Sequence, residues 1–142
     1  MDLFSIGQKV LAQQPFSKLL GTELVEFSAQ GAVLKIPIRD ELKQQFGFVH
    51  GGVLAYAADN ALTYAGAIGL GVEVVTAEFK INYLKPAQGD FLLARAVLVN
   101  AGKTQAVCRC DVYAVHAGGE TLCAVAQGTI AKLARAAADE GT

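Results

Sequence analysis

The sequence predicts one α+β domain in which an antiparallel sheet wraps around a long central helix. An apolar run from residue 51 to residue 72 contains a single carboxylate, Asp59. Two strand-like segments precede this run and four follow it, and most are joined by short turns that contain glycine. A helix that is apolar on nearly every side must be enclosed, and strands joined by tight turns pair antiparallel. The simplest arrangement therefore places the helix against the inner face of the sheet.

The first elements along the chain are a helix and a hairpin. A short amphipathic surface helix is expected over about residues 2–14, where Asp2 can cap its start and Pro15 ends it. Strands are expected at residues 22–28 and 32–38, because a glycine-containing turn separates two apolar segments there.

The central helix is expected from about residue 52 to residue 68, after a polar and irregular segment at residues 39–49. The glycine-rich residues 69–71 end it. Its length and hydropathy also resemble a membrane span. Asp59 near its centre argues against insertion, since an acid there costs about 2.5–3.5 kcal/mol. We therefore expect a core helix and no membrane contact.

The remaining chain is predicted to form four successive antiparallel strands and a tail. The segment 74–84 has the clearest two-residue alternation, with apolar residues at 75, 77, 79, 81 and 83 on one face and Thr76 on the other. The tail, about residues 134–142, is small or polar and is expected to be frayed. The four strands are expected at residues 74–84, 91–99, 105–115 and 121–132.

Composition limits the classes of partner. The 142 residues suit a single domain, and a net charge of −1 argues against nucleic-acid binding. Hydrophobic residues make up 53% of the chain, more than the roughly 45–50% of typical soluble domains, which favours packing between subunits. The N-terminus shows no signal-peptide pattern, and three cysteines suggest reduced thiols. We expect a cytoplasmic protein.

The cysteines are expected to pack in the core or on the sheet. Cys108 and Cys110 are two residues apart in a strand-like segment, so their side chains share one face. This spacing does not match a Cys-x-x-Cys zinc knuckle, and Cys123 does not complete a second pair. We expect no metal site.

The segment His50-Gly51-Gly52 and the acid Asp59 are the candidate catalytic group. Glycines leave backbone amides unshielded, and free N–H groups at the start of a helix favour a developing oxyanion. An acid in apolar surroundings is often protonated, partnered or catalytic. A loop of bare amides that opens a helix, with an acid further along it, could polarise a carbonyl and attack it.

This group and the order of the elements resemble the hotdog fold, and within it the PaaI-type acyl-CoA thioesterases. Asp59 lies nine residues after His50, and the downstream segment 81–86 reads Ile-Asn-Tyr-Leu-Lys-Pro. The resemblance covers about residues 21–132. It implies that the protein hydrolyses an acyl-CoA thioester, without a cofactor other than the CoA of the substrate, as a homodimer or a dimer of dimers.

The resemblance also implies roles for particular residues. The thioester carbonyl rests on the amide of Gly51, and Asp59 of the partner subunit acts as a nucleophile that forms a mixed anhydride or as a general base. Gln44, six residues before His50, also contacts the carbonyl or the attacking water. Thr63, four residues after Asp59, orients that water. The phosphates or pantetheine of CoA could be bound by Gly52, Asn82, Lys85, Lys103 and Arg109, although lysines near strand ends are usually only solvated.

Structural roles stay open for several of these residues. His50 is more readily explained as a hydrogen-bonding residue that holds the glycine turn than as a proton shuttle. Thr63 could bond only a backbone carbonyl one turn back. Gln44 could be solvated in its polar loop, and Asp59 could be a neutral or paired structural group.

Two other functions also stay open. Hotdog hydratases and dehydratases bind acyl thioesters on the same helix, although they need a histidine base placed beside an acid. A non-catalytic acyl-CoA-binding protein that regulates transcription is the second alternative, although it would be expected to carry a helix-turn-helix extension, for which 142 residues leave no room. The acyl group itself cannot be inferred, because side chains that only the assembled dimer brings together set the depth of the pocket.

Overall fold

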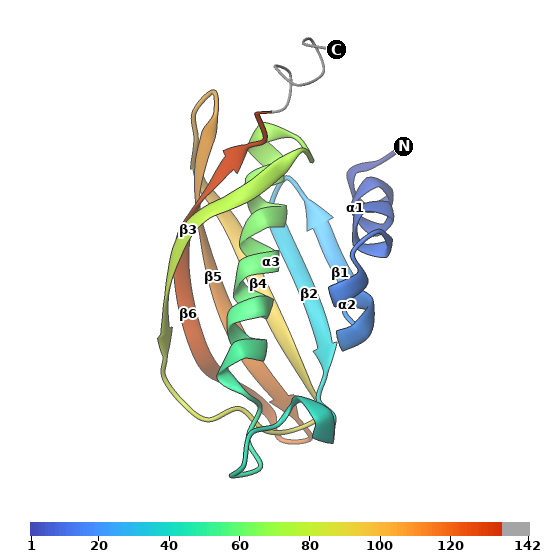
Figure 1. Cartoon of the computed structure of the whole chain (residues 1–142), viewed down its shortest axis with the longest axis vertical. Helices are drawn as coiled ribbons and strands as arrows, with labels where there is room; N and C mark the ends of the chain where they lie inside the picture. Colours follow the sequence, from blue (N-terminus) through green and yellow to red (C-terminus); the bar gives the residue numbers. More distant parts are fainter. Residues whose placement is uncertain (135–142) are drawn as a thin grey trace.

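A computed structural model describes residues 1–134 and shows a six-stranded antiparallel sheet curved around a long helix (Figure 1). This is the predicted fold, and the predicted order of the strands and the central helix is confirmed. The predicted frayed tail lies outside the described residues, except for residue 134. The elements are α1 (Leu3–Ala12), α2 (Pro15–Leu20), β1 (Glu23–Ser28), β2 (Gly31–Pro37), the 3-10 turn η1 (Asp40–Leu42), α3 (Gly51–Leu70), β3 (Val74–Tyr83), β4 (Phe91–Ala101), β5 (Gln105–His116) and β6 (Gly119–Lys132).

The strands lie in the order β1-β2-β4-β5-β6-β3, and all neighbours are antiparallel. The segment of α3 follows β2 in the chain, and the next strand, β3, joins the far side of the sheet beside β6. As a result β1 and β3 are the two edges, and α3 lies along the curved inner face between them (Figure 1).

The core lies between α3 and the sheet. The helix packs against β2, β3, β4, β5 and β6. Small residues of α3, including Ala57, Ala61 and Gly66, let the strands approach closely. Large aliphatic side chains from the sheet, such as Leu92 and Ile130, fill the space and have no exposed surface. Among the helices of residues 1–134, none combines the length and the hydropathy that a membrane crossing requires.

The N-terminal segment forms two helices where the sequence predicted one. Asp2 caps α1 as predicted, with its Oδ1 accepting the Ser5 N–H at 2.7 Å. Pro15 does not end this helix, which stops at Ala12, but instead begins α2. Proline fits the first position of a helix, where its missing N–H is not needed. The six residues of α2 are too few for a periodic pattern to reveal.

A β-bulge in β3 changes the predicted alternation of that strand. Thr76 pairs with Ile130 and Glu78 pairs with Thr129, so one extra residue of β3 lies between them. The extra residue reverses which face the earlier side chains occupy. Val75 is consequently 46% exposed, and Thr76 turns toward α3. The prediction that these two residues occupy the apolar and polar faces is wrong for this half of the strand.

The three cysteines are buried, as the sequence predicted. Burial raises the pKa of the Cys108 thiol to about 11 and also raises the pKa values of the Cys110 and Cys123 thiols. These thiols are therefore protonated near neutral pH and act as small apolar groups in the core.

Candidate active site

The segment before α3 forms a small loop that sets up the start of the helix. Gln44 N–H donates to the Phe48 carbonyl at 2.8 Å, and Gly47 sits at φ 87°, a conformation that favours glycine. His50 is the N-cap of α3, and its Nδ1 accepts the Gly52 N–H at 2.8 Å. Within residues 1–134, the Gly51 N–H has no acceptor. A free donor thus stands at the positive end of a 20-residue helix.

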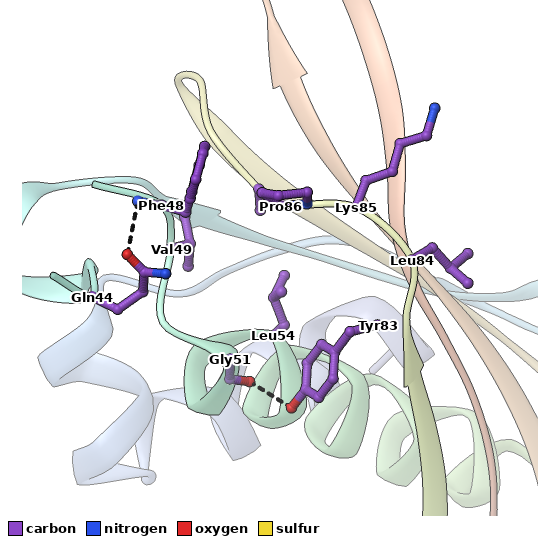
Figure 2. A pocket seen from close by; sticks show the side chains of 10 residues that line it. Gln44, Phe48, Val49, Gly51, Leu54, Tyr83, Leu84, Lys85 and Pro86 are labelled. Carbon is purple, nitrogen blue, oxygen red and sulfur yellow. Dashed lines mark hydrogen bonds between the residues drawn. The ribbon is translucent and has the colours of Figure 1, made fainter. Parts of the chain in front are cut away.

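Gly51 and Gln44 both line a pocket of about 320 Å³ at this end of the helix. The Gln44 Oε1 accepts the N–H groups of Phe46 at 2.5 Å and Phe48 at 3.3 Å. Figure 2 shows the amide oxygen turned toward the Phe48 backbone, with the amide nitrogen on the other branch. Because the oxygen is engaged, the Nε2 is the part of this side chain that can donate to a ligand.

Tyr83 also lines the Gly51 pocket. The sequence predicted no role for it in the site beyond its place in the segment 81–86. Its hydroxyl donates to the Gly51 carbonyl at 2.9 Å, as Figure 2 shows. A methyl group added at Gly51 would lie 3.4 Å from the Tyr83 ring, an ordinary contact. The tyrosine ends β3, so the edge strand and the start of α3 meet at this point.

Asp59 lies two turns further along α3 and is partly buried. The Thr76 hydroxyl donates to the Asp59 Oδ1 at 2.6 Å. Thr63 donates to the Asp59 backbone carbonyl at 2.9 Å and lies 3.0 Å from the Thr76 Oγ1. These three residues line a cavity of about 570 Å³. Sequence reasoning missed Thr76 because only the bulge turns it toward the helix.

Gly51 and Asp59 face different pockets of the same chain. Eight residues separate them, which corresponds to about 12 Å along a helix axis. The residues that line the two pockets do not overlap. A single carbonyl cannot lie within hydrogen-bond distance of the Gly51 amide while its carbon meets Asp59 of that chain.

The candidate CoA-binding residues do not gather at one place. Lys85 lines the pocket of Gly51, whereas the Gly52 N–H is occupied by His50. Asn82 and Arg109 line a separate hollow on the outer face of the sheet. Lys103 is exposed in the turn between β4 and β5. That turn follows Ala101, which packs beside Gly69 at the far end of α3 from Gly51.

Comparison with known proteins identifies the family. Residues 46–126, more than half of the chain, match the model of the thioesterase superfamily. The solved structure of a thioesterase family protein from Silicibacter pomeroyi is 33% identical, with a TM-score of 0.83 over 87% of this chain and 92% of that one. The Escherichia coli PaaI protein shares the fold, with a TM-score of 0.80 at 23% identity over 94% and 97% of the two chains.

A medium/long-chain acyl-CoA thioesterase of Escherichia coli is 25% identical over 128 residues, which cover 76% of this chain and 81% of that protein. The free amide at the start of α3 and the aspartate along it lie on the sheet-wrapped helix that these structures share. The chain therefore belongs to the thioesterase superfamily and has the hotdog fold of its PaaI-type members.

Proposed function

We propose that the protein hydrolyses an acyl-CoA thioester to a carboxylate and free CoA. The observation that carries the proposal is the pair of groups on α3: a Gly51 N–H without an acceptor among the described residues 1–134, and an Asp59 carboxylate held by Thr76. An oxyanion donor, together with a carboxylate that acts as nucleophile or general base, can catalyse acyl transfer from a thioester. Membership of the thioesterase superfamily supports the same chemistry.

The carbonyl oxygen of the thioester would accept the Gly51 N–H. Gln44 lines the same pocket, and its unengaged Nε2 would supply a second donor. Both donors are fixed before the substrate arrives, since the loop of residues 43–50 and the helix cap hold them. Such preorganised donors stabilise the negative charge that develops on the oxygen in the transition state.

Asp59 would attack or activate the attacking water. As a nucleophile, it forms a bond from Oδ2 to the carbonyl carbon and the CoA thiolate leaves, after which water hydrolyses the mixed anhydride. As a general base, it takes a proton from water, whose oxygen bonds the carbon as the thiolate leaves. Thr76 holds the Oδ1 at 2.6 Å in either route, so the Oδ2 is the oxygen available for reaction.

The proposed site combines two subunits. Because Gly51 and Asp59 of one chain face different pockets, a carbonyl held by Gly51 would meet Asp59 of a partner. We therefore propose a homodimer, or a dimer of dimers. We also propose that the enzyme is cytoplasmic and needs no cofactor beyond the CoA of its substrate.

A free-thiol assay with a panel of acyl-CoA compounds tests this function. Steady release of CoA supports hydrolysis. A change in enoyl absorbance without thiol release would indicate a hydratase, and saturable binding without turnover would indicate a binding protein. Either of these outcomes would overturn the proposal.

A further inference from the structure

A chain of hydrogen bonds joins the N-terminal helices to α3 beside Asp59. The Tyr56 hydroxyl donates to the Ser17 Oγ at 2.6 Å, and Ser17 donates to the Gln14 Oε1 at 2.6 Å. Thr22 lies 2.8 Å from the Tyr56 hydroxyl and must be the donor there, because the single Tyr56 hydrogen is already engaged. The bonds thus run in one direction and end on the Gln14 oxygen.

Asn60 completes this network with its nitrogen. The Nδ2 donates to the Gln14 Oε1 at 3.1 Å and to the Tyr56 hydroxyl at 3.2 Å. The orientation of both amides follows from these bonds. The network uses the oxygen of Gln14 and the nitrogen of Asn60, so the Gln14 Nε2 and the Asn60 Oδ1 point away from it.

The two remaining amide atoms are open to solvent. Among residues 1–134, every buried side-chain nitrogen and oxygen has a hydrogen-bond partner. The Gln14 Nε2 and the Asn60 Oδ1 have no partner within this part of the chain, so they are not buried. Both residues line the 570 Å³ cavity that contains Asp59. Both also line a small adjoining cavity of about 30 Å³. The wall shared by the two cavities therefore carries one free donor and one free acceptor.

The other walls of this cavity are largely apolar. Phe16 is 56% exposed and packs edge-on against Tyr56, with 5.2 Å between ring centroids. Val75, turned outward by the bulge, is 46% exposed and lines the same cavity. An apolar group of the substrate could lie against these side chains and carry a polar end to Gln14 and Asn60.

The charges around the two pockets indicate which part of the substrate enters the Asp59 cavity. No lysine or arginine of residues 1–134 lines that cavity, whereas Lys85 lines the Gly51 pocket. The phosphates of CoA are anionic and favour the cationic side. The uncharged acyl group is then left to occupy the cavity beside Asp59.

We propose that Gln14 and Asn60 are specificity-determining residues that bind a hydroxyl group at the far end of the acyl chain. A hydroxyl accepts one hydrogen bond and donates another, which matches the free Gln14 Nε2 and Asn60 Oδ1. The proposal rests on the proposed thioesterase function. Asn60 lies within residues 46–126, whereas Gln14 precedes them, so one of the two residues comes from a part of the chain that the family model does not match.

The test compares substrates that differ only in a terminal hydroxyl. We would measure kcat/KM by thiol release for hexanoyl-CoA against ω-hydroxyhexanoyl-CoA, and for benzoyl-CoA against para-hydroxybenzoyl-CoA. The enzymes are the wild type, Gln14→Met, and Gln8→Met as a matched control on the exposed side of α1. The ratio within one enzyme does not depend on the fraction that is folded, so any loss of stability in Gln14→Met cancels.

The wild type should prefer the hydroxylated member of a pair by about five- to thirtyfold, the range of one to two net hydrogen bonds. Gln14→Met should lose most of this preference, and Gln8→Met should keep it. Equal turnover of both members by the wild type would overturn the proposal while leaving thioester hydrolysis in place. A preference unchanged in Gln14→Met would overturn the assignment to Gln14. No thiol release from any substrate would overturn the proposed function, and this proposal with it.

Discussion

Asp59 has the environment of a reactive acid rather than of a packing residue. It is partly buried, it borders an open cavity, and one of its oxygens is held by a threonine. Asparagine is nearly the same size and keeps an oxygen that can accept from Thr76. Asp59→Asn should therefore fold normally and lose the charge on which both routes of attack depend.

We expect Asp59→Asn to lower kcat by at least about 10²–10⁴-fold, the usual worth of a general base. Thiol release measures the change, and thermal unfolding followed by circular dichroism controls for the fold. A folded variant with near wild-type kcat would show that Asp59 is not the attacking group.

Gly51 is proposed to act through its backbone, so only a change that removes the N–H tests it. Gly51 does not have a positive φ, and His50 before it has φ −58° and ψ 137°, a conformation that suits a residue preceding proline. Proline at the first helical position should therefore be accepted. Alanine should fit as well, because its methyl group would make an ordinary contact with Tyr83.

Activity should decrease in the order wild type, Gly51→Ala, Gly51→Pro. The proline variant should lose about 10²–10³-fold in kcat, since it lacks the oxyanion donor. KM should change less, because the donor acts mainly as charge develops. Equal kcat in two folded variants would assign the polarisation to Gln44 instead.

Site residues that are close together in the sequence could be predicted, whereas those that meet only through the fold could not. His50, Gly51 and Asp59 belong to one helix and its cap, so their spacing alone places them. Thr76 reaches Asp59 across 17 residues and Tyr83 reaches Gly51 across 32. No local pattern reports such contacts, and in β3 the bulge reverses the face that the alternation predicts for Thr76.

At the scale of elements, the start of α3 depends on a side chain that the sequence left with two interpretations. His50 accepts the Gly52 N–H through Nδ1, which is the bond of an N-cap. A methyl group at Gly52 would lie only 3.0 Å from that nitrogen, so glycine allows the close approach. Asparagine is also a good N-cap but cannot shuttle protons at neutral pH, which gives a test of the two roles.

His50→Asn should keep most of the stability and activity. His50→Ala should lose about 1 kcal/mol of stability with the cap and lose activity as the Gly51 amide is displaced. Thermal unfolding and kcat, measured on both variants, check this. If the two variants were equally inactive while His50→Asn kept wild-type stability, His50 would be acting on the substrate.

The helices and strands were largely predictable, because most are long enough to show the spacing of apolar residues that is typical of their type. The central helix and all six strands appear where the apolar alternation and the glycine turns place them. The exceptions are the three-residue turn η1 and the helix α2, whose six residues show no periodicity and which begins at a proline. The position of α2 matters, because Gln14 and Ser17 reach Asn60 and Tyr56 of α3 only when the chain turns into this helix.

At the scale of the whole molecule, one chain contains both proposed reacting groups, Gly51 and Asp59, but holds them too far apart to act on one carbonyl. The Gly51 pocket and the Asp59 cavity both border β3, an edge strand of the sheet. Exposed apolar side chains, among them Tyr83, Leu84 and Val75, lie along the same edge. A second copy that covers this edge would bury them and bring its own Asp59 toward Gly51.

Complementation between two inactive variants tests this assembly. One variant, Asp59→Asn, keeps the Gly51 amide, and the other, Gly51→Pro, keeps the acid. In a mixed dimer of two-fold symmetry, one site would combine the intact Gly51 of the first chain with the intact Asp59 of the second, and the other site would lack both. Random assortment makes half of the dimers mixed, so co-refolding equal amounts should restore roughly a quarter of wild-type activity.

Each variant refolded alone is the control and should stay inactive. Light scattering should report a dimer or a larger even-numbered assembly for every sample, so that a failure to associate is visible. No recovery of activity from samples that do contain mixed dimers would place the reacting groups within one chain. Because the helix keeps Gly51 and Asp59 about 12 Å apart, that result would require a different acid or a different oxyanion donor, and a fully active monomer would require the same.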